Sequence, residues 1–318
     1  MRGTILSSVF GLWLTIAIVF ALLTTALALT SCGDFTSGGN AQGSESPDEM
    51  AITSQSSEGM QGMNMETVDS STAGVHVDFS SDPAESQPGQ SVALHYLITY
   101  AGSSQVLTDL PIVHERPMHL IAVSKDLSQF QHIHPEVDAN GTYTVTATFP
   151  RAGTEILFDE FAPNGQMVLD RRELPVGKTS ETGASLSPDL SPKTEDGLTA
   201  SLLAPEAIEA GEDERFTLQV TRDGQPVTDL EPYLGAAAHV AIVSSDTRDF
   251  AHTHGEASEA DKGHEGMEDM ESMGSSSSTF GPEVSFHHTF PHAGLYKLWI
   301  QFGYQGSVIT VPYVVEVR

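Results

Sequence analysis

Cysteine is nearly absent from this chain of 318 residues, which contains Cys32 alone. A single cysteine excludes an internal disulfide, so the folded part depends on the packing of its core. The chain also lacks the G-x-S-x-G, H-E-x-x-H and Walker patterns of several large enzyme classes. We therefore expect no catalytic residues and a protein that is not an enzyme.

Basic residues are few as well, with 14 Lys+Arg against 43 Asp+Glu and a formal net charge of -29. Such a chain repels anionic polymers, so we expect no nucleic-acid partner. Two explanations of the charge stay open. Acid-rich, lysine-poor compositions are typical of exported proteins of salt-loving bacteria, where salt screens the self-repulsion. Attraction of metal cations is the other explanation.

The N-terminal segment indicates export. Residues 4–31 are uncharged and mostly apolar, and they lead directly into Cys32. The tetrapeptide LTSC at 29–32 resembles the lipobox of bacterial lipoproteins, which implies a signal peptide over 1–31 and lipid on the Cys32 sulfur. An uncleaved anchor helix is the alternative, because the run is long enough to span a bilayer. In either case we expect a membrane-anchored protein facing the periplasm or the cell exterior.

The rest of the chain divides into a tether and two repeats. Residues 32–72 are rich in Gly, Ser, Met and acidic residues, which predicts a disordered tether. Two blocks of short alternating stretches follow at 73–178 and 196–318, separated by a Ser/Pro/Thr-rich linker at 179–195. Alternation without a helical period predicts short antiparallel strands.

The two blocks match each other closely enough to be repeats. Two pairs of segments align. One pair is RPMHLIAVSKDLSQFQHIHPE and AAAHVAIVSSDTRDFAHTHGE, at an offset of 120 residues, and the other is FPRAGTEILFDEFAPNG and FPHAGLYKLWIQFGYQG, at an offset of 141 residues. The difference is an insertion of 21 residues within the Met/His/acid-rich segment 255–280. Each repeat has about 100 residues, a size that suits a seven-stranded immunoglobulin-like sandwich. We predict an all-β protein with two tandem immunoglobulin-like antiparallel β-sandwich domains.

A histidine pair recurs in the repeats as FQHIHPE at 130–136 and FAHTHGE at 250–256. Alternate residues of a strand share a face, so the two imidazoles of each pair project together and form half of a transition-metal site. A third histidine opens the strand HLIAV or HVAIV and would lie opposite the pair in an antiparallel neighbour. The candidate ligands are His119, His132 and His134, then His239, His252 and His254.

A structural role for these histidines is the alternative. Buried imidazoles bonded to backbone carbonyls are common, and the pair could pack beside Phe130. Asp126 and Asp246 also match between the repeats, either as acceptors that fix a histidine tautomer or as turn caps. The second repeat carries three further histidines without counterparts in the first: His287, His288 and His292.

Most methionines lie in polar segments that are not expected to form a hydrophobic core. Methionine normally fills hydrophobic cores, yet seven of the nine after Met1 lie in the tether or the insertion. Thioether sulfur prefers Cu(I) to hard cations. The segments resemble Met/His-rich stretches of envelope copper-handling proteins, which implies copper, with Cu(I) favoured, although low-complexity drift is the alternative. The candidate ligands here are Met60, Met63, Met65, His264, Met267, Met270 and Met273, with Met50 nearby.

The string MHLIAVSKDLSQFQHIHPE and the repeated FPxAG motif resemble a family of exported bacterial lipoproteins. Its tandem β-sandwich repeats carry D-L-x-x-F-x-H-x-H-P, and YtkA-like envelope proteins are a more distant likeness. The second repeat departs from the motif at Thr247 and Gly255. The resemblance implies an envelope lipoprotein that binds copper, or another soft or borderline transition metal, for sequestration or delivery to a metal-transport protein. The alternative is a non-catalytic scaffolding or interaction module.

Overall fold

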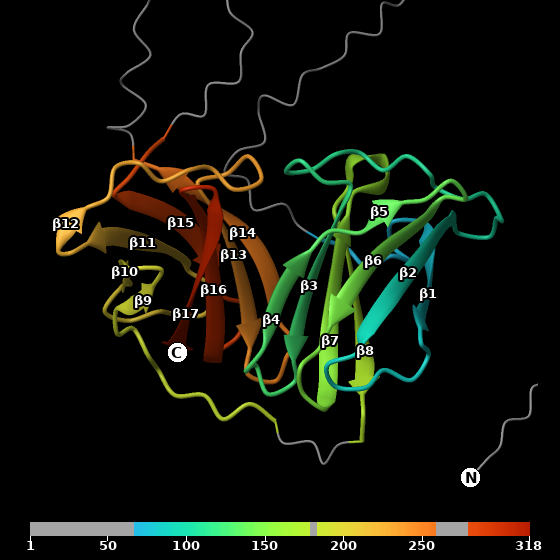
Figure 1. The fold of residues 1–318 in the computed structure, drawn as a ribbon, viewed down its shortest axis with the longest axis horizontal. Helices are drawn as coiled ribbons and strands as arrows, with labels where there is room; N and C mark the ends of the chain where they lie inside the picture. The colour runs from blue at the N-terminus through green and yellow to red at the C-terminus, as the bar shows by residue number, and fades with distance from the viewer. Residues whose placement is uncertain (1–66, 179–182, 259–278) are drawn as a thin grey trace, which may run out of the picture. The chain divides into compact units, whose positions relative to one another are not determined.

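The computed structural model describes residues 67–178, 183–258 and 279–318, and the structural statements below concern these residues (Figure 1). They form β-strands and one 3-10 turn, Pro163–Gly165. None of the helical structure within these ranges is long and apolar enough to cross a membrane. The expected signal peptide and residues 32–66 of the expected tether fall outside the described residues. The predicted end of the tether at residue 72 is wrong: Val68 N–H donates to the Met167 carbonyl oxygen at 3.0 Å, and Val68 forms a bridge with Val168, so the first repeat begins before residue 73.

The first repeat is a sandwich of two four-stranded antiparallel sheets. One sheet has the order β1-β2-β6-β5, with β1 at Val75–Asp82, β2 at Ser91–Tyr100, β6 at Thr142–Thr148 and β5 at Glu136–Val137. The other has the order β4-β3-β7-β8, with β4 at Phe130–Ile133, β3 at Met118–Ser124, β7 at Gly153–Phe161 and β8 at Val168–Val176. This is the strand order of an immunoglobulin-like sandwich with one extra strand beside C.

The second repeat has the same two-sheet arrangement, joined through one strand. β17 (Ser307–Val317), β16 (Gly294–Tyr304), β13 (Ala238–Ser244) and β14 (Phe250–Ala257) follow one another in the first sheet. The second sheet holds β15 (Glu283–Thr289), β11 (Asp213–Arg222), β10 (Leu198–Leu203) and β9 (Lys193–Glu195), with β12 (Gln225–Pro226) paired to β11. The prediction of two antiparallel sandwiches is confirmed, although short additional strands bring the repeats to eight and nine rather than seven.

One residue explains why β14 is continuous where the first repeat has two strands. Pro135 separates β4 from β5, since proline has no N–H to donate to a ladder. Gly255 stands at the equivalent position, and β14 passes it from its pairing with β13 to its pairing with β15. A Cβ at Gly255 would lie 2.4 Å from Val284 Cγ1, so the crossing also requires the small residue.

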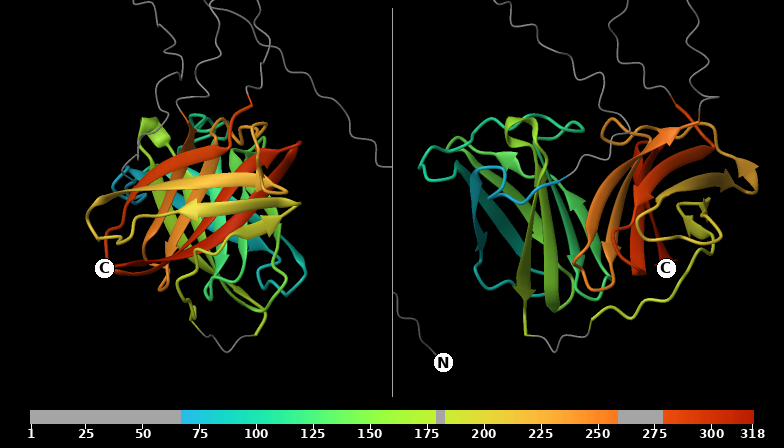
Figure 2. Two further views of the ribbon diagram at one scale, coloured as in Figure 1. Left: turned by 90° about the vertical axis from the view of Figure 1, so that its left-hand side faces the viewer. Right: turned by 180° about the vertical axis from the view of Figure 1, so that it is seen from behind.

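The two repeats pack against each other through their β3- and β13-containing sheets (Figures 1 and 2). Along β3, Leu120 and Ala122 point into the core of their own repeat, whereas Ile121 and Val123 join a separate cluster with Trp299 of the second repeat. Because both faces of β3 and β13 are covered, all seven residues of each strand are buried. An uninterrupted apolar run is the sequence pattern of such a strand.

Contacts between the repeats come in matched pairs. Phe130 stacks on Trp299 at 5.1 Å between centroids, and Phe250 stacks on Phe158 at 4.2 Å. Phe130 corresponds to Phe250, and Phe158 to Trp299, at the offsets of 120 and 141 that relate the repeats. Each contact therefore recurs with the repeats exchanged, as at the two-fold interface of a homodimer.

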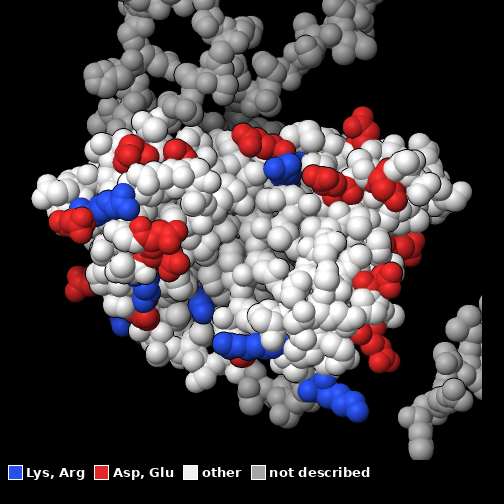
Figure 3. Space-filling model, viewed as in Figure 1, with Lys and Arg blue, Asp and Glu red and all other residues white. Residues whose placement is uncertain are grey.

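The turns that follow β3 and β13 each accept a hydrogen bond from the other repeat, although the two donors are not equivalent residues. Lys297 Nζ of β16 donates to the carbonyl oxygen of Leu127 at 2.6 Å, and Arg171 Nε of β8 donates to that of Thr247 at 3.0 Å. Figure 3 shows Asp and Glu side chains over both sandwiches, whereas much of the middle of the viewed face carries no charge.

Candidate metal centre

Seven histidines meet where the two sheets face each other. Three combinations of them bring one ring nitrogen from each of three residues within 4.8 Å of one another. They come from β3, β4, β13, β14 and the segments beside these strands, and together we call them the histidine cluster. Its members are His114, His119, His132, His134, His239, His252 and His254.

The first repeat supplies a compact trio. His119 Nδ1 lies 3.1 Å from His132 Nε2, and His134 Nε2 lies 3.2 Å from the same atom. Nitrogens bound at 2.0–2.1 Å to one tetrahedral ion are separated by about 3.3 Å. The spacing of the trio thus matches the edge of a tetrahedral metal site.

The remaining ring nitrogens fix the tautomers of two members of the trio. His119 Nε2 is 2.9 Å from the carbonyl oxygen of Val113, which can only accept, so the proton of His119 is on Nε2. His132 Nδ1 donates to Gln301 Oε1 at 2.8 Å, while Gln301 Nε2 donates to Thr310 Oγ1. We assign lone pairs to His119 Nδ1 and His132 Nε2, which face each other without a proton between them. With these tautomers, a bound cation would remove the repulsion between the two lone pairs.

The second repeat builds the matching pair. His239 Nδ1 lies 2.9 Å from His252 Nε2, and His239 Nε2 lies 3.4 Å from the carbonyl oxygen of Leu234. His252 Nδ1 is 2.7 Å from Glu160 Oε2. Glu160 and Gln301 are equivalent residues, each opposite the first histidine of its own repeat and each contacting the central histidine of the other. A histidine oriented by a carboxylate or amide is the usual arrangement behind a metal ligand.

His254 of the second repeat has different neighbours from its equivalent in the first repeat, His134. Its ring stacks on His114 at 3.6 Å between centroids, and its Nε2 is buried without a hydrogen-bond partner. His114 lies in the turn between Val113 and Arg116, with φ of 47°. The equivalent turn residue of the second repeat is Leu234, so this seventh histidine has no counterpart.

Burial keeps the cluster uncharged in the absence of a metal. Burial, reinforced for each by a neighbouring imidazole, lowers the pKa of His119, His132 and His134 to about 3. Burial likewise lowers the pKa of His254 to about 2, and it lowers the pKa of His239 and of His252 well below the usual value of a histidine. Neutral imidazoles are the form that binds transition metals, so protons compete little for these nitrogens.

Among the described residues, Glu160 is the carboxyl group that contacts a histidine of the cluster. Its side chain is 5% exposed and that of His252 is 4% exposed. Burial raises the pKa of Glu160 to about 8. The same burial lowers the pKa of His252, so the metal-free pair is favoured as a neutral one. A cation on His252 would favour the carboxylate form of Glu160.

The structure brings together all six histidines expected from the β-strands and adds three residues that the sequence did not point to. Those three are His114, Glu160 and Gln301. Glu160 and Gln301 act across the contact between repeats, which the sequence analysis did not foresee. His114 has no matching histidine in the second repeat, so the comparison of repeats passes over it.

Asp126 and Asp246 do not orient histidines. Asp126 Oδ1 accepts from Ser124 Oγ at 2.5 Å and from the Ser128 backbone at 3.0 Å, and Asp246 repeats the pattern with Ser244. The turn-cap alternative is therefore correct for both, because a short carboxylate satisfies the free N–H groups of its own turn.

The other histidines of the second repeat lie apart. His287 and His292 are exposed and pair with Asp213 and Asp249, whereas His288 is buried on β15 against Phe290. Several candidates fall outside the described residues and stay predictions: Cys32, Met60, Met63, Met65, His264, Met267, Met270 and Met273.

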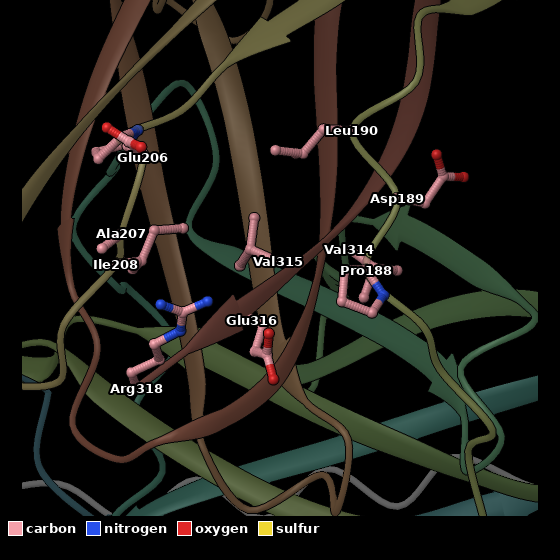
Figure 4. Close-up of a pocket in the computed structure, with 11 residues that line it drawn as sticks. Pro188, Asp189, Leu190, Glu206, Ala207, Ile208, Val314, Val315, Glu316 and Arg318 are labelled. Carbon is pink, nitrogen blue, oxygen red and sulfur yellow. The ribbon is translucent and has the colours of Figure 1, made fainter.

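A surface pocket lies elsewhere, between the end of the linker and β17 (Figure 4). Leu190, Ile208 and Val315 line it together with Glu206 and Arg318. It contains no histidine and is separate from the cluster. Its mixed apolar and polar lining does not by itself indicate a ligand.

Comparison with known families identifies the family to which this chain belongs. A family model described as a domain of unknown function, DUF8832, matches residues 68–176 and 193–318. The chain belongs to this DUF8832 family. The match covers both sandwiches, and the family's description assigns no activity. No curated protein matches the chain.

Solved structures resemble the chain only loosely. A mutant of Salmonella alpha-2-macroglobulin has 13% identity and a TM-score of 0.25, over 80% of this chain and 15% of that one. A putative membrane-anchored protein from Corynebacterium diphtheriae has 12% and 0.21, over 77% and 57%. Invasin, a bacterial integrin-binding protein, has 12% and 0.21, over 75% and 39%. The chain thus spans a small part of the alpha-2-macroglobulin, and scores this low add nothing to the fold described above.

Proposed function

We propose that this protein binds transition-metal ions in the histidine cluster, with copper as the principal cargo, for sequestration or delivery at the cell envelope. The observation that supports the proposal is the separation of 3.1 Å between His119 Nδ1 and His132 Nε2, between which the tautomers assigned from the Val113 and Gln301 contacts place no proton. Two buried lone pairs at that distance repel each other, and an ion between them removes the repulsion. His134 offers a third nitrogen at a suitable separation.

The chemistry of the donors narrows the choice of ion. Imidazole nitrogen suits copper, zinc and nickel, whereas calcium and magnesium require oxygen ligands. The sequence also contains methionines in the N-terminal segment 32–72 and in the segment 255–280 of the second repeat, and thioethers favour Cu(I). Copper is the ion common to both donor types. The envelope location rests on the export signal and LTSC motif of the N-terminal sequence.

A structural role is the second candidate, and one observation favours it. Burial raises the pKa of Glu160 to about 8. A protonated Glu160 donates to His252 Nδ1, whose Nε2–H then donates to His239 Nδ1. In that state the second pair is a complete hydrogen-bond chain that joins the repeats without metal, as expected of a scaffolding module.

Metal titration of the purified full chain in detergent separates the two candidates. We expect tight binding of Cu(I) and Cu(II), measured by competition with chelators, and its loss in the H132A/H252A double variant. The matched control is H76A/H287A, which removes two exposed histidines and should bind as the wild type does. If wild type and H132A/H252A bind copper equally weakly, the scaffold with structural histidines is the correct function.

A further inference from the structure

Among the described residues, three groups of histidines in the cluster have the spacing of a metal site, and the groups overlap. The first is His119, His132 and His134, the second is His132, His239 and His252, and the third is His114, His239 and His254. The second group shares His132 with the first and His239 with the third. It is therefore the central group of the cluster.

The central group takes its members from both repeats. His132 lies on β4 of the first repeat, whereas His239 and His252 lie on β13 and β14 of the second. The centroids of the three rings are 5.0, 5.1 and 5.6 Å apart. Rings whose nitrogens bind one tetrahedral ion at about 2.0–2.1 Å have centroids about 5 Å apart. The spacing of the central group thus suits a single ion between the repeats.

The hydrogen bonds behind these rings also cross between the repeats. His132 Nδ1 donates to Gln301 Oε1 of the second repeat at 2.8 Å, and His252 Nδ1 lies 2.7 Å from Glu160 Oε2 of the first. Each histidine is thus oriented by a residue of the other repeat. Convergence of the central group therefore depends on the docking of the repeats.

His119 places a further imidazole of the first repeat beside the central group. Its Nδ1 lies 3.1 Å from His132 Nε2. His119 is the equivalent of His239, and His132 is the equivalent of His252, so the four rings form two equivalent pairs. Every pair of these rings is separated by 5.0 to 6.2 Å between centroids. Both repeats therefore contribute imidazoles around the same point.

Building on the proposed function, we propose that a single ion is held between the repeats by His132, His239 and His252, and that binding of this ion and docking of the repeats stabilise each other. An ion with ligands from both repeats binds the docked arrangement, and by linkage it strengthens docking by the factor by which docking raises its affinity. Because this ion occupies His132 and His239, the other two groups are each left with two histidines. Separation of the repeats then releases the ion.

Zinc titration of the full chain tests the inference, because thioethers contribute little to Zn(II) binding. His252 belongs to the central group alone, His134 to the first alone and His254 to the third alone. Glutamine keeps a polar side chain at each place and suits transition metals less well than imidazole. We expect H252Q to weaken zinc binding by more than about 100-fold, since even a hydrogen-bond partner behind a ligand typically contributes 10- to 100-fold. The matched controls H134Q and H254Q should bind zinc nearly as tightly as the wild type.

The coupling to docking has its own readout. F158A removes a contact between the repeats at a residue outside the cluster. It should weaken zinc binding by at least about 5-fold, the lower end of typical coupling between linked equilibria. In thermal unfolding, zinc should raise the melting temperature of the wild type and of H134Q but not that of H252Q. An ion held within one repeat would leave the zinc affinity of F158A equal to that of the wild type.

The outcomes separate this inference from the function beneath it. If H252Q keeps wild-type affinity, if H134Q or H254Q weakens zinc binding as much as H252Q does, or if F158A binds zinc as tightly as the wild type, the inference is overturned while metal binding stands. Two tightly bound zinc ions per wild-type chain would also overturn it. If circular dichroism shows H252Q to be unfolded, H239Q replaces it, because an ion held by the first group would leave H239Q unaffected. If the wild type binds copper but not zinc, the same comparisons with Cu(II) decide, and absence of tight binding of both metals would instead remove the proposed function.

Discussion

Phe158 of the first repeat and Phe250 of the second stack face to face, with centroids 4.2 Å apart and planes 8° apart. Phe158 is fully buried although its side chain points away from the core of its own sandwich. The stack therefore joins the two repeats. The histidine cluster lies on the same pair of sheets, so its geometry depends on this docking.

Substitution F158A should lower the free energy of unfolding by about 3 kcal/mol, since it leaves a cavity between the repeats. Urea denaturation followed by circular dichroism measures the loss. We also expect separate transitions for the two repeats and weaker copper binding, because the histidines of one repeat are then no longer held against those of the other. F286A, which removes a stacked ring inside the second repeat alone, is the control and should destabilise that repeat without separating the two. A loss below about 1 kcal/mol in F158A would contradict a docked arrangement.

Gly255 offers a test of the strand that crosses between sheets. A Cβ there would lie 2.4 Å from Val284 Cγ1 and 3.0 Å from Ala238 Cβ, so G255A should destabilise the protein by about 1–3 kcal/mol. Thermal unfolding measures the change. Gly153 is the matched control, since nothing lies within 4 Å of its Cβ position and its φ is ordinary. G153A should therefore leave stability within about 0.5 kcal/mol of the wild type, and equal melting temperatures for the two variants would argue against the close packing at Gly255.

Much of this architecture follows from local sequence patterns. Period-two alternation and the recurrence of the H-x-H pair are enough to predict the strands, the two sandwiches and the six histidines at 119, 132, 134, 239, 252 and 254. These features depend on residues within one strand or on neighbouring strands. The register His239↔His254 shows the expected placement of the third histidine opposite the pair.

The partners of those histidines could not be predicted in the same way. Glu160 is 92 residues from His252, and Gln301 is 169 residues from His132, and both contacts exist only because the repeats dock. One signal of docking was present in HLIAV and HVAIV, whose apolar runs continue without alternation. A strand exposed on one face would alternate, so these runs indicate burial on both.

His288 makes stability depend on pH independently of the cluster. Its ring is buried against Phe290, its Nδ1 lacks a hydrogen-bond partner, and burial lowers its pKa to about 4, partly opposed by Asp213. Its pKa in the unfolded chain is about 6.5. As the pH falls below that value, the unfolded chain takes up a proton that the folded protein does not, so this histidine costs stability between about pH 6.5 and pH 4.

Substitution H288F should remove that cost. Between pH 7.5 and pH 5 the variant should gain about 2 kcal/mol of stability relative to the wild type, from about 1.5 pH units at 1.36 kcal/mol each. Urea denaturation at both pH values measures the difference, and the other buried histidines cancel because both proteins contain them. Parallel stability curves for H288F and the wild type would show that His288 is protonated equally in the folded and unfolded states.

The methionines supply the final prediction, which concerns the choice of oxidation state. Substitution of Met267, Met270 and Met273 by leucine removes three thioethers but keeps similar volume and apolar character. Because thioethers favour Cu(I), the triple variant should bind fewer Cu(I) ions per chain, whereas Cu(II) and Zn(II) binding by the imidazoles should be unchanged. Competition titrations with a Cu(I)-specific and a Zn(II)-specific chelator measure both quantities on one preparation. The M118L variant is the control, since Met118 is buried in the core of the first repeat. An unchanged Cu(I) stoichiometry in the triple variant would confine copper binding to nitrogen ligands and leave the methionine clustering without a role in metal capture.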